Sequence, residues 1–187
     1  MTQMQERAPL DGRTLRNAFG KFPTGVVAVC ALDGEEPVGM AVSAFMPVSL
    51  EPPLLSVCIQ KSSTTWPQLR RCGAIGVSVL SREQREHAQR LSSKDGDRFA
   101  GIGMLALPSG AVVLEDTHAW FVCEVDASHD AGDHDIVVLR ILDLYVEDEA
   151  DDPMVFFGSR FRGIRHLGGR PHPAYADTPI PATKKRV

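Results

Sequence analysis

The sequence predicts a mainly β protein that closes into an antiparallel barrel, and three observations lead to this prediction. Strand-like apolar runs outnumber helical segments along the 187 residues. The helical segments are short and connect neighbouring strands, which is typical of closed antiparallel architectures. The chain also lacks the glycine-rich strand-to-helix turn of dinucleotide-binding domains, so a doubly wound sheet with a nicotinamide site of that type is not expected.

Each expected strand is an apolar or alternating run bounded by turn residues. Asp33-Gly34 is a hairpin signal that joins the first two strands. A polar, glycine-containing loop over 92–103 separates the two halves of the chain. In chain order, the strands are expected at residues 25–32, 37–42, 54–60, 74–80, 111–114, 118–128, 135–146 and 154–157.

Three short helices are expected between the strands. Gly20 is placed to end the first of them, which begins after Asp11, and Gly73 closes the second. Ser81 and Gln84 have the spacing of a capping box, which predicts the start of the third. The expected helices cover residues 15–19, 65–71 and 81–91.

Composition narrows the class of protein. With 43% hydrophobic residues the chain is long enough for one domain, expected over 1–167, while 168–187 is expected to be an extended or disordered tail rich in proline, glycine and charge. The net charge of -4 and the scattered cationic residues make nucleic acid an unexpected partner. No apolar run approaches the roughly 20 residues of a membrane span, and the polar N-terminus is unlike a signal peptide, so a cytoplasmic protein is expected.

The four cysteines are predicted to be buried free thiols. They are widely separated, form no C-x-x-C pair, and three of them lie in apolar runs where a thiol acts as a small hydrophobe. They are Cys30, Cys58, Cys72 and Cys123.

The most informative segment runs from Gly39 to Pro53 and is followed by LLSVCIQ and KSSTTW. Its small, mostly uncharged residues between strand-like segments predict backbone that approaches a flat ligand closely. Lys61 supplies a positive charge, and the hydroxyls of 62–65, with the N–H groups that open the next helix, suit an anion. A flat polar ring plus a phosphate describes flavin mononucleotide (FMN).

Six segments of the chain occur in the same order in a known family. They are FPTGV at 22–26, GMAVSAF at 39–45, SLEPP at 49–53, KSSTTWPQL at 61–69, DRFAG at 97–101 and GDH at 132–134. From about residue 15 to 164 the chain therefore resembles the flavin reductase family, the small reductase components of two-component flavin-dependent monooxygenases. The resemblance implies the FMN-binding split β-barrel, antiparallel with Greek-key connections and short connecting helices.

The resemblance also implies an activity. It is that of an NAD(P)H:flavin oxidoreductase, which transfers hydride from NADH or NADPH to FMN, or to FAD, and releases the reduced flavin to a partner monooxygenase. Hydride transfer is the cofactor's own chemistry, so the protein has to bind the ring, hold the nicotinamide against it and stabilise the developing negative charge. Backbone N–H donors of 41–44, with the Ser43 hydroxyl, suit that task.

Flavin contacts are carried over from the family residue by residue. The resemblance implies that the ring and the ribityl chain lie against Met40, Ala41, Val42, Ser43, Ala44, Ser49 and Leu50, and that the phosphate lies against Lys61, Ser63 and Thr65. The alternative is structural: GMAVSAF is then an edge strand and KSSTTW an ordinary helix start.

His134, in the GDH turn, is the expected catalytic residue. In the resembling family this histidine lies beside the flavin where the nicotinamide stacks, and a neutral or positive imidazole there orients the carboxamide or the reduced ring. Two alternatives remain: a solvated histidine in an acidic turn, or a metal pair with His129 and the ligands Asp130 and Asp133. A third histidine or a cysteine is missing nearby, and no metal is expected.

Three further residues complete the expected site. DRFAG is expected to order a loop over the flavin with Phe99 as its apolar anchor, and the resemblance places Phe157 and Arg160 beside the nicotinamide pocket. Arg160 faces either nucleotide phosphates or solvent, and one of the two aromatics at 156–157 is expected in the core. Ser78 stands where many relatives carry asparagine, so it is left out of the site.

A homodimer with the flavin sites at the subunit boundary is expected, since the family pairs this way and the run 137–146 is apolar on both faces.

Two other functions remain open. One is a non-catalytic flavin-binding or scaffold protein of the same fold, and the other is a pyridoxamine-phosphate-oxidase-like enzyme. The choice of nicotinamide, of flavin and of partner monooxygenase is not determined by the sequence.

Overall fold

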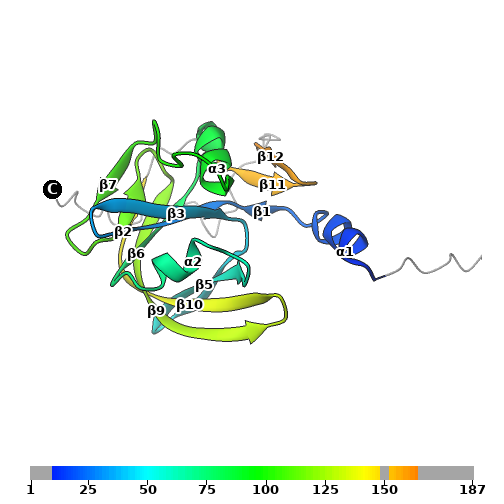
Figure 1. The fold of residues 1–187 in the computed structure, drawn as a ribbon, viewed down its shortest axis with the longest axis horizontal. Coiled ribbons are helices and arrows are strands. Elements are labelled where there is room, and N and C mark those ends of the chain that lie inside the picture. The colour runs from blue at the N-terminus through cyan, green and yellow to red at the C-terminus, as the bar shows by residue number, and fades with distance from the viewer. Residues whose placement is uncertain (1–9, 148–151, 164–187) are drawn as a thin grey trace, which may run out of the picture.

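Seven antiparallel strands form the main sheet of the protein, in the order β3-β2-β6-β9-β10-β5-β4 (Figure 1). The structure is a computed structural model that describes residues 10–147 and 152–163. Non-sequential neighbours such as β2 with β6 give the sheet its Greek-key order. The strands are β2 Val27–Asp33, β3 Glu36–Val42, β4 Phe45–Leu50, β5 Pro53–Gln60, β6 Ile75–Val79, β9 Ala119–Ala131 and β10 His134–Val146.

The sheet curls into a barrel because its two edge strands are consecutive in the chain. Only residues 43–44 separate β3 from β4, so the two edges of the sheet have to meet. The Ala44 carbonyl accepts a hydrogen bond of 3.0 Å from the Cys58 N–H at that junction. The mainly β, antiparallel barrel predicted from the sequence is confirmed.

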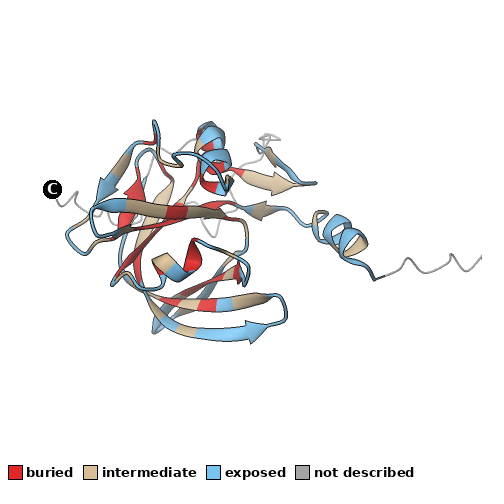
Figure 2. Cartoon of the chain, in the orientation of Figure 1, coloured by how far each residue is buried: buried red, intermediate tan, exposed pale blue. Residues whose placement is uncertain are grey.

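The barrel interior is filled by alternate residues of the strands. Along β5, Leu55, Val57 and Ile59 are buried in the main apolar cluster, and Val137 and Leu139 of β10 face them. Figure 2 shows this buried interior and the exposed end of the β9–β10 hairpin. A second apolar cluster packs β2 and β8 against α3.

The remaining elements are two small sheets and three short helices around the barrel. Two small sheets lie beside it, one of β1 Thr24–Gly25, β11 Val155–Phe157 and β12 Arg160–Arg162, the other of β7 Met104–Ala106 and β8 Val112–Leu114. The helices are α1 Gly12–Phe19, α2 Trp66–Leu69 and α3 Arg85–Ser92, the last preceded by the 3-10 turn η1 Arg82–Gln84. None of these helices is long and apolar enough to span a membrane.

Local capping signals are present at two helix starts, although the first helix begins at Gly12, three residues before the predicted range of 15–19. The Asp11 carboxylate accepts hydrogen bonds from the N–H groups of Arg13 and Thr14 at 2.9 and 2.7 Å, and these bonds lower the pKa of Asp11. The Gln84 side chain accepts the Ser81 N–H at 3.0 Å, as in the predicted capping box. The second helix is shorter than predicted, because it ends at Leu69 rather than at residue 71.

All eight expected strands are present, but four others were missed. The important one is β4, which lies within the segment interpreted above as ligand-binding backbone. Its sequence, FMPVSL, does not alternate, and it becomes a strand by pairing with β5, from Phe45 opposite Val57 to Leu50 opposite Pro53. Pro47 is tolerated because β4 is an edge strand. The others are β1, β7 and β12.

The cysteine prediction is correct for two residues and wrong in part for two. All four thiols are free. Cys30 and Cys123 are buried, and burial raises the pKa of each to about 12. Cys58 and Cys72 are only half-buried, because they lie near the exposed ends of β5 and α2. The predicted tail, residues 168–187, lies outside the described residues.

Candidate functional site

The loop of residues 61–66, which links β5 to α2, carries the residues predicted to bind a phosphate. We call it the 61–66 loop. It is held from two sides, by the segment after α3 on one and by the β9–β10 hairpin on the other. The two sets of contacts give the loop two polar faces with different chemistry.

On the first face, Arg98 connects the loop to β3. Its Nη1 atom donates to the Thr65 hydroxyl at 2.6 Å and to the Gly39 carbonyl at 3.2 Å. Thr65 is buried, so its hydroxyl is committed to this contact. Arg98 was missed in the sequence analysis, although a basic residue inside the DRFAG motif was the signal that would have found it.

Two more contacts bring the predicted flavin residues together on this face. Ser63 Oγ accepts the Trp66 N–H at 3.1 Å and lies 3.9 Å from the sulphur of Met40 on β3. Phe99 packs over Gly39, where an added Cβ would lie 2.8 Å from the ring of Phe99. The glycine is therefore needed for this close approach, and Phe99 packs its ring against β3 and the second apolar cluster. That it anchors a loop over a flavin stays a prediction.

The end of β3 offers mainly backbone to a ligand. Val42 is buried in the main cluster, and Ala41 packs against the second one, so neither side chain is free to line a ring. Ser43 is half-buried and Ala44 is exposed. Contact of these N–H groups and of the Ser43 hydroxyl with a ligand stays a prediction.

On the second face, Lys61 is bound by the β9–β10 hairpin. Its Nζ lies 2.5 Å from the Asp130 carboxylate and 2.6 Å from the Gly132 carbonyl. Through this contact Asp130 raises the pKa of Lys61, and Lys61 lowers the pKa of Asp130. Both side chains are exposed, so the pair adds little stability, but it directs the lysine towards the GDH turn. This pairing was not predicted.

His134 begins β10 directly opposite Gln60, the last residue of β5, so it lies next to the 61–66 loop. Its Nδ1 is 2.8 Å from the Asp133 carboxylate, and this contact lowers the pKa of Asp133. The imidazole is 42% exposed and accessible to a ligand. Residues 10–147 and 152–163 contain no group of three or more histidine, cysteine, aspartate or glutamate side chains able to hold a metal ion.

Four predicted residues lie elsewhere in the chain. Ser49 and Leu50 pair with Leu54 and Pro53, the first residues of β5. Gln60, from which the 61–66 loop continues, is the last residue of β5, roughly 20 Å from Leu54 at about 3.3 Å per residue. Leu50 is 98% exposed. Within one chain, these two residues do not meet the 61–66 loop.

Phe157 and Arg160 are also apart from the loop. They belong to the small sheet with β1, and the Gly158 N–H next to them donates to the Gly20 carbonyl at 2.8 Å. Phe156 and Phe157 are both half-buried, and Phe156 packs against the second cluster and Phe161, while Arg160 is exposed. The expectation that one of the two aromatics lies in the core is therefore met only in part. Ser78 is buried and accepts the Leu114 N–H at 3.0 Å, which gives it a structural role.

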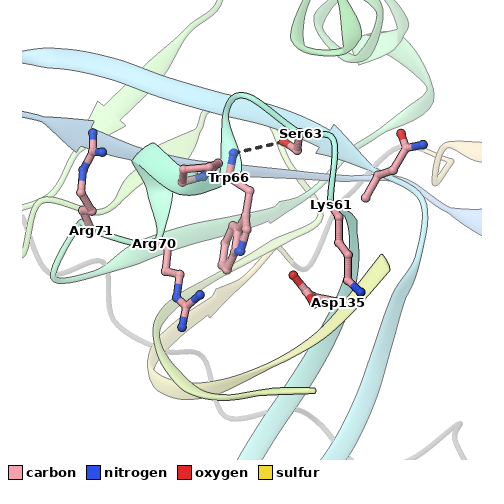
Figure 3. Close-up of a pocket in the computed structure, with 8 residues that line it drawn as sticks. Lys61, Ser63, Trp66, Arg70, Arg71 and Asp135 are labelled. Carbon is pink, nitrogen blue, oxygen red and sulfur yellow. Dashed lines mark hydrogen bonds between the residues drawn. The ribbon is translucent and has the colours of Figure 1, made fainter. Parts of the chain in front are cut away.

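A hollow of about 420 Å³ opens on the second face of the 61–66 loop (Figure 3). We call it the loop hollow. It lies between α2 and the start of β10. The residues that line it are Gln60, Lys61, Ser63, Trp66, Pro67, Arg70, Arg71 and Asp135.

The donors on the first face fit the phosphate of a flavin. A guanidinium, a serine hydroxyl and a half-buried turn lie together there, and oxygen anions are the ligands that such groups bind. A few residues along β3 from Met40, the junction of residues 43–44 is half-buried at Ser43 and exposed at Ala44, so its backbone is accessible.

Comparisons with known proteins agree with this description. Residues 19–165 match the family described as flavin reductase like domain. A flavin reductase of Pseudomonas putida is 38% identical over 159 residues, which are 84% of this chain and 93% of the relative. The reductase subunit HsaB of a flavin-dependent monooxygenase from Rhodococcus jostii is 36% identical, over 83% of this chain and 79% of its own.

A solved structure shares the fold. The NADH:FAD oxidoreductase SgcE6 of Streptomyces globisporus, in complex with NAD and FAD fragments, superposes with a TM-score of 0.81 and 31% identity. The match covers 88% of this chain and 99% of that one.

Proposed function

The chain belongs to the flavin reductase-like family, and from this premise we propose that it transfers a hydride from NADH or NADPH to FMN or FAD and passes the reduced flavin to a partner monooxygenase. The observation that carries the proposal is the convergence of Met40, Ser63, Thr65, Arg98 and Phe99 on one face of the 61–66 loop. These residues come from three segments far apart in the sequence.

The first face of the loop is the proposed flavin site. Arg98 and Ser63 bind the phosphate, with Lys61 contributing charge from the edge of the loop and Thr65 holding Arg98 in position. The backbone of residues 41–44 and the Ser43 hydroxyl donate hydrogen bonds to the ring. When bound, the flavin supplies the hydride-accepting chemistry, while this chain supplies binding, orientation and donors.

His134 is the proposed orienting group for the nicotinamide. The Asp133 carboxylate lies 2.8 Å from Nδ1 and accepts a proton held there, and in the tautomer with its proton on Nδ1 the ring presents Nε2 as an acceptor. An acceptor at that position suits the amide N–H of a nicotinamide carboxamide. Asp133 therefore fixes both the tautomer and the direction of the ring.

The activity itself is the first prediction. Purified protein should oxidise NADH or NADPH slowly alone and rapidly when free FMN or FAD is added, because flavin is a substrate as much as a cofactor. The measurement is the loss of absorbance of the reduced nicotinamide with each flavin in turn. If FMN, FAD and riboflavin all fail to stimulate it, the protein is a binding module and the proposed function is wrong.

His134→Ala is expected to lower nicotinamide affinity or the rate of hydride transfer by about 10- to 100-fold, the loss expected when one polar contact is removed, while oxidised flavin still binds. Single-turnover reduction of bound flavin and a titration of flavin fluorescence measure the two quantities. His129→Ala is the matched control, because His129 is an exposed histidine of the same hairpin. Equal effects of the two substitutions would remove His134 from the site.

We also propose that the protein is a homodimer with its flavin sites at the subunit boundary. β4 and β10 expose large apolar side chains, among them Leu50 at 98% and Met46 at 58%. Ser49 and Leu50 lie far from the 61–66 loop of their own chain. They join a flavin site if the 61–66 loop of a second copy lies against them across a two-fold axis.

Helix α1 supports the same proposal. It has no buried residue, it extends away from the barrel in Figure 1, and Phe19 is 70% exposed. An eight-residue helix is not stable in water by itself, so it needs a packing partner, and a second copy provides one.

Light scattering is expected to give twice the 20.4 kDa of one chain. Leu50→Asp should shift the mass towards one chain, since it places a charge in the proposed interface, whereas Leu105→Asp, at an exposed leucine of β7, should not. A mass of one chain at concentrations where the reductase is active would contradict both the dimer and the shared site.

A further inference from the structure

The tip of the β9–β10 hairpin is held in place by polar contacts. The pairing of β6 with β9 stops at Cys123, so in the part of the chain that the structure describes residues 124–131 of β9 pair with β10 alone. Residues 128–133 are all exposed, and apolar packing therefore does not fix this tip. A segment with so little packing is held loosely, and the few contacts that it makes with its surroundings decide its position.

Lys61 makes three of these contacts. Its N–H donates to the Asp133 carbonyl at 3.0 Å, and its Nζ lies 2.6 Å from the Gly132 carbonyl and 2.5 Å from the Asp130 carboxylate. The side chain thus crosses the turn from the end of β5 towards the end of β9, and Figure 3 shows it beside Asp135 at the start of β10. Asp130 is the main cause of the raised pKa of Lys61, so the lysine is charged at neutral pH.

The same contacts extend to the imidazole of His134. Asp133, whose carbonyl binds the Lys61 N–H, has its carboxylate 2.8 Å from Nδ1 of His134. His134 also pairs in register with Gln60, the residue before Lys61. A movement of the turn relative to the 61–66 loop would therefore move the imidazole as well.

Hydride transfer is sensitive to such a movement, because a misplacement of about 1 Å can cost about 100-fold in rate. We propose that Asp130 is a positioning residue for this reaction: through Lys61 it fixes the GDH turn, and with it His134, against the 61–66 loop. In this role Asp130 touches neither substrate. The ion pair is too exposed to add much stability, so what it supplies is the position of the turn. This inference rests on the proposed function.

The KM values of the two substrates, each measured with the other substrate saturating, test this role. Asp130→Ala should raise the KM of the reduced nicotinamide about 5-fold, the loss expected of an exposed ion pair. It should not raise the KM of the flavin, because the released Lys61 keeps its charge at the edge of the loop. A merely structural role would impair both substrates. An equal rise for both, or no rise for the nicotinamide, would overturn the proposal.

Asp126→Ala is the matched control. Asp126 lies in the same strand and forms an ion pair with Arg140, which is opposite Leu54 at the other end of β5 from the 61–66 loop. Its loss should leave both KM values unchanged. Asp130→Asn keeps the shape and an acceptor oxygen but not the charge, so it should give a smaller rise than Asp130→Ala. It replaces Asp130→Ala if that chain does not fold.

Double-mutant cycles trace the path from Asp130 to His134. With Lys61→Met, Asp130→Ala should raise the KM of the nicotinamide no further than either change alone. In a His134→Ala chain, Asp130→Ala should have no further effect, because its effect passes through the imidazole. Additive effects in either cycle would mean that Asp130 acts by another route, and the proposal would be wrong.

Amide hydrogen exchange followed by NMR tests the same contact without any reductase activity. The Lys61 N–H, which donates to the Asp133 carbonyl, should exchange about 5-fold faster in Asp130→Ala and at the unchanged rate in Asp126→Ala. Faster exchange in a chain that reduces no flavin retains Asp130 as the residue that fixes the turn and overturns the proposed function. Unchanged exchange and unchanged KM values in an active reductase overturn the inference alone.

Discussion

Arg98→Ala is expected to weaken FMN binding about 10- to 150-fold, the loss that corresponds to a charge-assisted contact of about 1.5–3 kcal/mol. The reason is that Arg98 both presents its guanidinium to the proposed phosphate position and holds Thr65 and the Gly39 carbonyl in place. The measurement is the Kd of FMN and of riboflavin, followed through flavin fluorescence.

Comparing FMN with riboflavin distinguishes two roles of Arg98, a direct contact with the phosphate and the positioning of the 61–66 loop. Riboflavin lacks the phosphate, so a direct contact predicts a much smaller loss for riboflavin than for FMN. Arg98→Lys should keep the positive charge but lose the planar guanidinium, whose Nη1 binds Thr65 and Gly39 while Nη2 and Nε stay available to a phosphate. Equal losses for both flavins would mean that Arg98 only positions the loop, and no loss for either would remove it from the site. Arg90→Ala is the control, because Arg90 is an exposed arginine of α3.

Gly76→Val is expected to destabilise the fold by about 4 kcal/mol or more, which is an exceptional value for one substitution. Gly76 is buried in β6 between β2 and β9, and an added Cβ would lie 2.0 Å from the Val112 carbonyl oxygen and 2.6 Å from its carbon. Those are backbone atoms of β8, so a rotamer change cannot relieve the clash.

Urea unfolding followed by circular dichroism measures this effect. Gly73→Ala is the matched control, because no atom lies within 4 Å of an added Cβ there, and it should change stability by less than about 0.5 kcal/mol. If Gly76→Val were as stable as Gly73→Ala, the close packing of β8 on β6 described above would be incorrect.

The predictions that succeeded depended on information local in the chain. Alternating apolar runs predicted the positions of the eight strands, and Asp11 and the Ser81–Gln84 pair predicted two helix starts, because caps and turns involve neighbours only a few residues apart. The ordered motifs led to the family for the same reason, since each motif is a short contiguous segment. The strand β4 was missed because its sequence does not alternate and only its pairing with β5 makes it a strand.

The arrangement of the site was decided by tertiary structure. Arg98 reaches Thr65 from 33 residues away, and Lys61 reaches Asp130 from 69 residues away. Neither pairing has a signal at short range. Both arise because barrel closure brings β3 to β4 and because strand pairing aligns the first residue of β10 with the last residue of β5.

Strand register also places Ser49 and Leu50 at the far end of β5, although the sequence puts them only about a dozen residues before Lys61. Composition and local pattern therefore determined which elements form, whereas strand pairing over long sequence separations decided which side chains meet, because each strand can extend only about 3.3 Å per residue along a fixed register.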